Sequence, residues 1–412
     1  ILHALLRSDD APFRLEGDDD DDRAYEATIE MDPGTFDLDY LFGIREMGFN
    51  RISLGVQSFD DDLLATMGRV HRSTDVRRSV EMIGEVFGEG SANYSIDLIS
   101  GVPGLTLAGW AETLYEAARL RPRPTHMSLY DLQVERGTTF GKWYGDTQRE
   151  EERVIIPVTT RGHDDDTTHS TASRRHPVLP SAEDCAFMYS YASGYLRSKD
   201  YEHYEISSYA YGGGEDGFGA SRHRAMHNQI YWQYDGQWYA VGLGATSNVD
   251  GVRFPRPRAL SDYISWTESL SRDYFPEISG DGCDEGDDTR VPPWLRGEVT
   301  NANEGTDDED DDDDDGLLDI VMTRLRTSEG LDLDWVAGRD EYGASHVEAI
   351  LRGFGLALEL GLGAREDDDD DADRRPRERN RHGRIRLNDP KGFLFSNNII
   401  SNIFVELSEM DS

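Results

Sequence analysis

The chain has 412 residues, with 82 acidic and 42 basic side chains and a formal net charge of −40 at pH 7. This balance argues against a nucleic-acid-binding protein, which needs a net basic face, and no apolar stretch reaches the roughly 18 residues of a membrane-spanning helix. The two cysteines exclude a disulfide scaffold and a self-contained four-cysteine zinc or iron–sulfur site.

Much of the acidic excess lies in four runs made of Asp and Glu alone. They occupy residues 18–22, 164–166, 307–315 and 366–371. Such runs repel themselves and stay solvated. We therefore interpret them as loops, linkers and insertions added to a folded chain.

A parallel sheet is predicted for residues 25–135, where apolar runs alternate with amphipathic helices. The apolar runs are 27–31, 51–56, 93–99 and 126–132, and the intervening helices begin near residues 38, 73 and 107. Strands separated by helices of this length indicate right-handed βαβ units. Four strands are too few for a closed eight-stranded barrel, so we expect an open or partial barrel. In its first helix we expect Leu38, Leu41, Phe42 and Met47 to share one face.

The rest of the chain is predicted from weaker patterns. Residues 183–196 form an amphipathic helix, and residues 201–211 and 229–249 are aromatic and glycine-rich, as in strands joined by tight turns. Helices at 317–325, 348–360 and 396–407, with a hairpin of 384–387 and 392–394, indicate a winged-helix-like α+β domain.

These patterns divide the chain into six parts. They are a remnant helix and acidic loop (1–24), the partial barrel (25–145), an insertion (146–182), the end of the barrel (183–275), an acidic linker (276–316) and the C-terminal domain (317–412) with an acidic insertion at 366–383.

Polar residues cluster where the predicted strands end. They are Glu30, Gln57, Asp97, Ser100, Asp131 and Gln133. In parallel α/β barrels ligands bind at the carboxyl ends of the strands. A carboxylate such as Glu30 can bind two ribose hydroxyls, and Arg69 can bind a carboxylate with paired hydrogen bonds. The same residue types are also typical of loops and helix caps, so both interpretations stay open.

A second candidate site lies in the segment HRAMHNQIYW at residues 223–232. His223 and His227 stand beside Tyr231 and Trp232. An exposed histidine among aromatic side chains can ligate haem iron, and it can equally be a structural residue that bonds a neighbour. We interpret Cys185 as a packing residue of a helix and Cys283 as incidental.

Eight segments, in this order, resemble one family. They are TIEMDPGTF (28–36), GFNRISLGVQSFDDDLLATMGRVH (48–71), SIDLISGVPG (95–104), HMSLYDLQVERGTTFGKW (126–143), YEHYEISSYA (201–210), HNQIYW (227–232), GLGATSNVDGVRFPRPR (242–258) and DPKGFLFSNNIISNIF (389–404). The chain resembles the radical S-adenosylmethionine (SAM) proteins of the oxygen-independent coproporphyrinogen III oxidase group. Within that group it resembles the HemW-type haem chaperones.

The resemblance implies a partial (β/α)₆ barrel, a 4Fe–4S cluster and SAM as cofactors, and haem as a cargo passed to acceptor proteins. By position, the residues that match SAM contacts of the family are Glu30, Gln57, Arg69, Asp97 and, more weakly, Asn248. His227 and His223 are the haem candidates.

The family's CxxxCxxC motif, which holds the cluster, is absent from this chain. We therefore expect an N-terminally truncated protein that lacks the first barrel strands and assembles no cluster. Two alternatives remain, an oxygen-independent coproporphyrinogen III oxidase and a catalytically dead scaffold. The expected compartment is the cytoplasm or an organelle, although no targeting peptide is visible.

Overall fold

The computed structural model describes residues 25–144, 176–212, 220–234, 236–249, 252–273, 315–339, 342–366 and 382–410. The chain forms two compact units. Unit 1 comprises Ile1–Arg224 and Asn388–Phe395, and unit 2 comprises Ala225–Leu387 and Ser396–Ser412. The acidic runs fall almost wholly outside the described residues. The six-part division predicted from the sequence stays a prediction.

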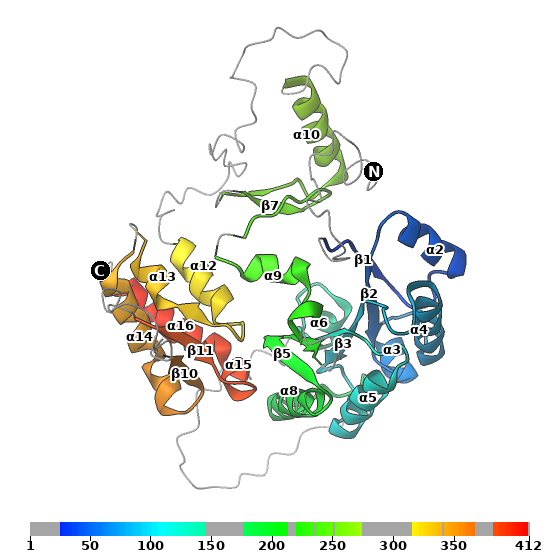
Figure 1. Ribbon diagram of the computed structural model, residues 1–412, viewed down its shortest axis with the longest axis horizontal. Helices are drawn as coiled ribbons and strands as arrows, with labels where there is room; N and C mark the ends of the chain where they lie inside the picture. Colours follow the sequence, from blue (N-terminus) through cyan, green and yellow to red (C-terminus); the bar gives the residue numbers. More distant parts are fainter. Residues whose placement is uncertain are drawn as a thin grey trace. The chain divides into compact units, whose positions relative to one another are not determined.

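Unit 1 is built on an open six-stranded sheet (Figure 1). Its strands are β1 (Thr28–Met31), β2 (Arg51–Gln57), β3 (Tyr94–Ser100), β4 (His126–Asp131), β5 (Tyr201–Glu205) and β6 (Ser208–Tyr211), in the order β1-β2-β3-β4-β6-β5. The first four are parallel, and β6 pairs antiparallel with both β4 and β5. The prediction of an open barrel of alternating strands and helices is confirmed.

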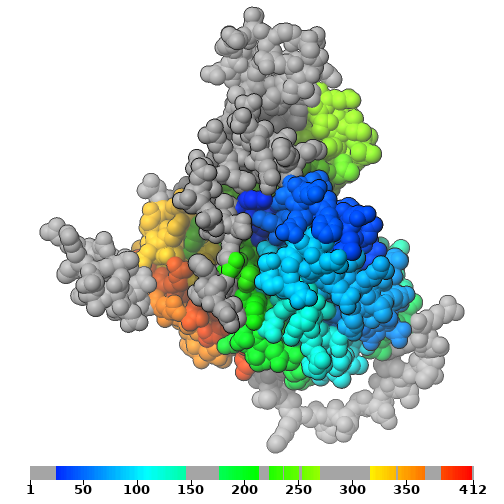
Figure 2. Space-filling view, turned by 45° about the vertical axis from the view of Figure 1, so that its right-hand side comes forward, coloured from blue at the N-terminus to red at the C-terminus, as the bar shows by residue number. Residues whose placement is uncertain are grey.

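Helices cover one face of this sheet. Every second residue of the central strands points to that face and is apolar, so the helices bury it. They are α2 (Leu38–Glu46), α3 (Asp61–Thr66), α4 (Ser73–Phe87), α5 (Leu107–Arg119) and α8 (Ala182–Arg197), with the short α6 (Thr139–Tyr144) after β4. Leu54, Ile96 and Met127 are fully buried in this layer. From β1 to α5 these residues form one continuous surface, coloured blue to cyan in Figure 2.

The predicted inner face of α2 is partly wrong. Leu41 is buried as expected, but Phe42 and Met47 are 46% and 52% exposed, and Ile44 is buried instead. Leu41 and Ile44 are three residues apart and therefore share a helix face, whereas Phe42 is rotated by about 100° from Leu41.

Unit 2 contains a β-hairpin, a three-stranded sheet and several helices. The elements are α9 (Met226–Trp232), β7 (Thr246–Val249), β8 (Val252–Pro255), α10 (Leu260–Asp273), α12 (Asp315–Arg324), β9 (Leu331–Asp332), α13 (Leu333–Ala337), α14 (Ala344–Glu359), β10 (Gly363–Glu366), β11 (Arg384–Leu387) and α16 (Ser396–Ser408). The predicted helices near 317, 348 and 396 are present. Among the described residues, none of the helices is both long and apolar enough to cross a membrane.

Two predictions for the second half of the chain are wrong. Residues 229–232 belong to helix α9, in which the rings of His227 and Tyr231 meet one turn apart. The predicted hairpin partner 392–394 lies in the short helix α15 (Lys391–Leu394) of unit 1, with Phe393 buried. Strand β11 pairs instead with β10 and β9. Residues 367–381 separate β10 from β11, so no short turn marks the pair in the sequence.

Candidate functional site

The face of the unit 1 sheet opposite the helical layer is lined by polar side chains. Glu30 is opposite Ser53, Ser53 is opposite Ser95, and Asp97 is opposite Ser128. Side chains alternate along each strand, so these residues share one face across four strands. The structure therefore brings Glu30 and Asp97 to the same side of the sheet, as the sequence predicted.

Asp97 is a half-buried carboxylate near the centre of this polar face. Ser53 Oγ donates to Asp97 Oδ2 over 3.2 Å, and Ser95 Oγ donates to Ser53 Oγ over 3.0 Å. Burial raises the pKa of the Asp97 carboxyl group, hydrogen bonds from Ser128 and Ser53 oppose that shift, and the charge of Glu30 adds to it. The result is an oriented carboxylate with lone pairs for the hydroxyl groups of a ligand.

Tyr130 belongs to the same polar face and was missed by sequence reasoning. It follows Ser128 by two residues on β4, and burial raises the pKa of its phenol, as do the charges of Asp97, Glu205 and Glu30. A hydrogen bond with Ser128 opposes this shift. The available signal was the alternation of the polar residues His, Ser and Tyr with the apolar residues Met and Leu in HMSLYD, which marks a strand with one polar face.

A second group of polar residues surrounds Gly55 near the carboxyl end of β2. A Cβ atom on Gly55 would lie 2.8 Å from Asp32 Oδ1 and 3.0 Å from Gln57 Nε2, so both side chains close over this glycine. Gln57 has a left-handed backbone with φ of 65°. Arg69 Nη1 is 3.5 Å from Asp32 Oδ1. Gln57 and Arg69 are thus grouped around Asp32, whose only sequence signal was the DPG turn after the first strand.

His126 lies on the polar face and is fully buried. Its Nε2 is 2.8 Å from the Tyr204 hydroxyl, and its Nδ1 has no hydrogen-bond partner among the described residues. Burial lowers the pKa of His126 well below its usual value, and the charges of Arg51 and His223 lower it further. His126 is therefore a neutral imidazole.

The two predicted haem candidates belong to different units. His223 ends the 3₁₀ helix η1 (Ala220–His223) of unit 1, and His227 lies in α9 of unit 2. The His227 side chain is exposed, and its ring meets that of Tyr231 edge-on at 5.1 Å. Tyr231 in turn meets Trp238 at 4.6 Å. Trp238 was not predicted as part of this site.

Apolar side chains near in sequence to this aromatic group are also exposed. They are Met226, Tyr239, Val241 and Leu243, all in unit 2. Patches of exposed apolar side chains mark binding surfaces, and the contact between the rings of Tyr231 and Trp238 joins α9 to the segment that holds Tyr239, Val241 and Leu243. We call α9 together with Trp238–Leu243 the aromatic surface of unit 2.

Asn248, the fifth predicted SAM residue, has a clear structural role within unit 2. Its side-chain amide donates to the Gly236 carbonyl over 2.8 Å, and its backbone exchanges two hydrogen bonds with Trp238. Asn248 therefore fixes the segment that carries Trp238. Its predicted contact with SAM stays a prediction.

The open sheet of parallel strands, with polar side chains along one face and apolar side chains under a helical layer on the other, defines an α/β protein of the partial-barrel class. The solved structure of coproporphyrinogen III oxidase (HemN) from Escherichia coli, described as a radical SAM enzyme, has the same fold, with a TM-score of 0.56 over 92% of this chain and 70% of that one. The two are 18% identical in sequence.

Sequence comparisons define the family. The Radical SAM superfamily model matches residues 5–116. Haem chaperone HemW of Synechocystis sp. is 32% identical over 384 residues, which cover 93% of this chain and 75% of that protein. The HemW proteins of Bacillus subtilis and Escherichia coli are 31% and 28% identical, over 58% and 57% of this chain. The chain belongs to the HemW family of radical SAM proteins.

The chain spans only about half the length of two of these relatives, 52% of the Bacillus subtilis protein and 49% of the Escherichia coli protein. Its own residues do not fit a 4Fe–4S cluster. Three thiolates in one loop are needed to hold such a cluster with an open iron, and the chain has two cysteines, Cys185 and Cys283. Cys185 is half-buried in α8, and Cys283 lies outside the described residues. We assign no reaction step to a cluster in this chain.

Proposed function

We propose that this protein is a haem chaperone that binds haem on the aromatic surface of unit 2 and passes it to acceptor proteins. Haem needs an axial ligand and flat apolar contacts. One observation carries the proposal: His227 is exposed and its ring is followed by those of Tyr231 and Trp238. The names of the HemW relatives support haem as the cargo. The oxidase alternative rests only on similarity of fold to HemN.

Ferric haem titrated into the wild-type chain and His227→Ala, followed by the Soret band, tests this proposal. We expect saturable binding of one haem per chain in the wild type and at least tenfold weaker binding in the variant, or about 1.4 kcal/mol. The matched control is His176→Ala, because His176 also stacks on an aromatic ring, that of Trp143, at 4.1 Å. Equal losses in both variants would overturn the proposal.

We propose further that the polar residues of unit 1 hold SAM. Glu30 and Asp97 provide carboxylates for the ribose hydroxyls, and Gln57 and Arg69 provide donors for the methionyl group. The grouping of Asp32 Oδ1 and Gln57 Nε2 beside Gly55 supports this, since it gathers polar atoms at one point of the sheet. When bound, SAM supplies the adenosyl and methionyl groups used in radical SAM chemistry, and the chain's own residues bind and orient it.

Calorimetric titration with SAM separates this role of Arg69 from a general effect of charge. Arg69→Ala removes a charge-assisted pair, so we expect SAM affinity to fall by roughly 1.5–3 kcal/mol. Arg78→Ala, on the exposed side of α4, is the control and leaves affinity unchanged. Unchanged affinity in Arg69→Ala would remove Arg69 from the site.

A further inference from the structure

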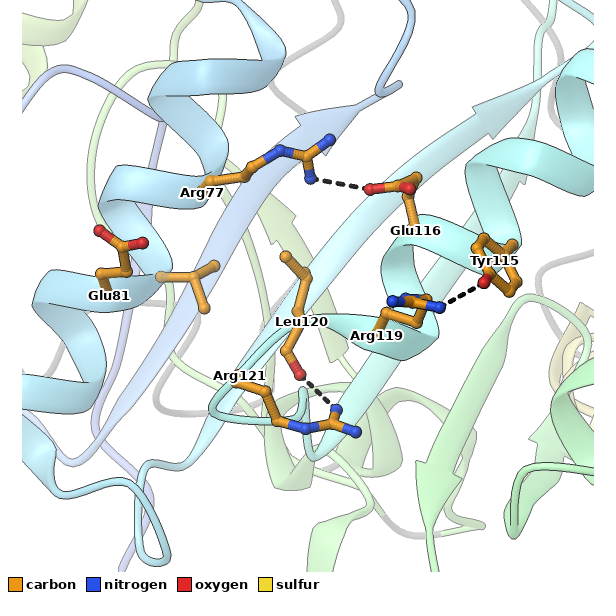
Figure 3. Close-up of a pocket in the computed structure, with 8 residues that line it drawn as sticks. Arg77, Glu81, Tyr115, Glu116, Arg119, Leu120 and Arg121 are labelled. Carbon is orange, nitrogen blue, oxygen red and sulfur yellow. Dashed lines mark hydrogen bonds and ion pairs between the residues drawn. The ribbon is translucent and has the colours of Figure 1, made fainter.

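A pocket of about 430 Å³ opens between helices α4 and α5 of unit 1 (Figure 3). Arg77 from α4, Arg119 from the end of α5 and Arg121 from the following loop all line it. This loop leads into the amino end of β4, whereas Gln57 ends β2 at its carboxyl end. The pocket is therefore separate from the polar face that carries Glu30 and Asp97.

The three guanidinium groups differ in how their charge is compensated. Arg77 Nη1 forms an ion pair of 2.8 Å with Glu116. Arg119 donates to the Tyr115 hydroxyl and lies 4.9 Å from the centre of that ring, and Arg121 Nη1 donates to the Leu120 carbonyl over 2.7 Å. Within the described part of the chain, neither Arg119 nor Arg121 pairs with a carboxylate.

The backbone that carries Arg121 is held in place before any ligand arrives. Its loop alternates arginine with the buried prolines Pro122 and Pro124. The Tyr94 hydroxyl donates to the Pro122 carbonyl and the Tyr201 hydroxyl to the Pro124 carbonyl, each over 2.6 Å. A ligand that binds here therefore needs to order little additional backbone in this loop, which favours affinity.

The charged groups of the pocket are three arginines and two glutamates, Glu81 and Glu116, and they leave one positive charge in a chain whose net charge is −40. Donors come from two directions, the end of α5 and the loop before β4. A planar carboxylate is satisfied by one guanidinium fork, whereas the tetrahedral oxygens of a phosphate accept from several donors at once. We propose that this pocket binds a phosphate group of a small organic phosphate or pyrophosphate, with Arg119 and Arg121 as its donors.

Calorimetric titration of the full chain with pyrophosphate tests the proposal, with citrate as the carboxylate probe. We expect saturable binding of pyrophosphate that weakens about tenfold or more when Arg119→Gln and Arg121→Gln are combined. The matched control is Arg123→Gln, which removes a nearby arginine that lies over Tyr211, outside the pocket, and binds within about twofold of wild type.

Glu116→Gln is a second test variant, for which the expected result is a gain of pyrophosphate affinity and not a loss. It removes a negative charge and releases Arg77 toward the ligand, so pyrophosphate binds more tightly than to the wild type. The absence of saturable binding in the wild type at about millimolar pyrophosphate, an equal loss in Arg123→Gln, equal affinity for citrate, or weaker binding in Glu116→Gln would each overturn the proposal.

Discussion

The histidines in the sheet of unit 1 and the histidine on the aromatic surface of unit 2 differ in burial and in their neighbours. His126 and His203 of the sheet are almost completely buried, and their ring nitrogens face a hydroxyl, a carboxylate and a carbonyl of the same unit. His227 of unit 2 is exposed beside aromatic rings. Histidines enclosed by the fold stabilise it, and an exposed one among aromatic side chains is placed to bind a ligand.

The two sheet histidines differ from each other as well. His126 lies on the polar face, and among the described residues the Tyr204 hydroxyl is the one hydrogen-bond partner of its ring. His203 lies on the helix-covered face, stacked at 4.1 Å on Tyr209, and its Nδ1 is 2.7 Å from Asp389 Oδ1. Asp389 also accepts from Ser193 and Arg197 of α8. The segment 388–395 is therefore anchored in unit 1 by one carboxylate.

Removing that carboxylate is expected to have the largest effect. Asp389→Asn leaves the buried imidazole without its anionic partner, and we expect a loss of about 2–3 kcal/mol of unfolding free energy at pH 7. Denaturant unfolding measures it, with the exposed Glu85→Gln on α4 as a control expected within about 0.5 kcal/mol. A loss no larger than the control's would contradict the anchoring role.

The same variant has a defined pH dependence. Burial acts to raise the pKa of Asp389, but the hydrogen bond and charge of His203, with Ser193 and Arg197, lower it overall. A lowered carboxyl pKa adds stability above the unfolded value of about 3.9, and that stability is lost as pH falls through the folded value. Wild type and Asp389→Asn should therefore converge below about pH 4.

His126 is expected to affect the stability of the chain in a higher pH range than Asp389. Its pKa is well below that of an unfolded histidine, chiefly through burial. Below about pH 6.5 His126 is protonated in the unfolded chain but stays neutral in the folded chain. The free energy of unfolding therefore falls by up to about 1.4 kcal/mol per pH unit. His126→Phe should flatten the unfolding free energy between about pH 6.5 and 5. The same slope in both proteins would show that His126 is protonated in the fold.

Asp97→Asn is expected to change the free energy of unfolding least, and in the opposite direction to Asp389→Asn. The pKa of Asp97 is raised by burial and by Glu30, so its ionisation opposes folding as pH rises above the unfolded value. Asp97→Asn should stabilise the chain by about 1 kcal/mol at pH 7 and by nothing below about pH 4. It should also weaken SAM binding. A lower melting temperature at pH 7 would show that the carboxylate stabilises the fold.

The sequence predicted those parts of unit 1 that depend on local pattern. The strands at 28–31, 51–57, 94–100 and 126–131 follow from apolar runs between amphipathic helices, and Glu30 and Asp97 follow from the parallel direction of these strands. The partnership of His203 with Asp389 was not predictable, because 186 residues separate them. Asp32 and Trp238 were also missed, because the sequence does not show that Asp32 lies beside Gly55 or that Trp238 pairs with Asn248.

The electron paramagnetic resonance spectrum of ferric haem bound to the chain tests the central claim most directly. We expect the signature of an imidazole-ligated iron in the wild type and in His176→Ala. We expect its loss in His227→Ala and its return when free imidazole is added to that variant. An unchanged imidazole signature in His227→Ala would place the haem ligand elsewhere and contradict the haem site proposed for α9.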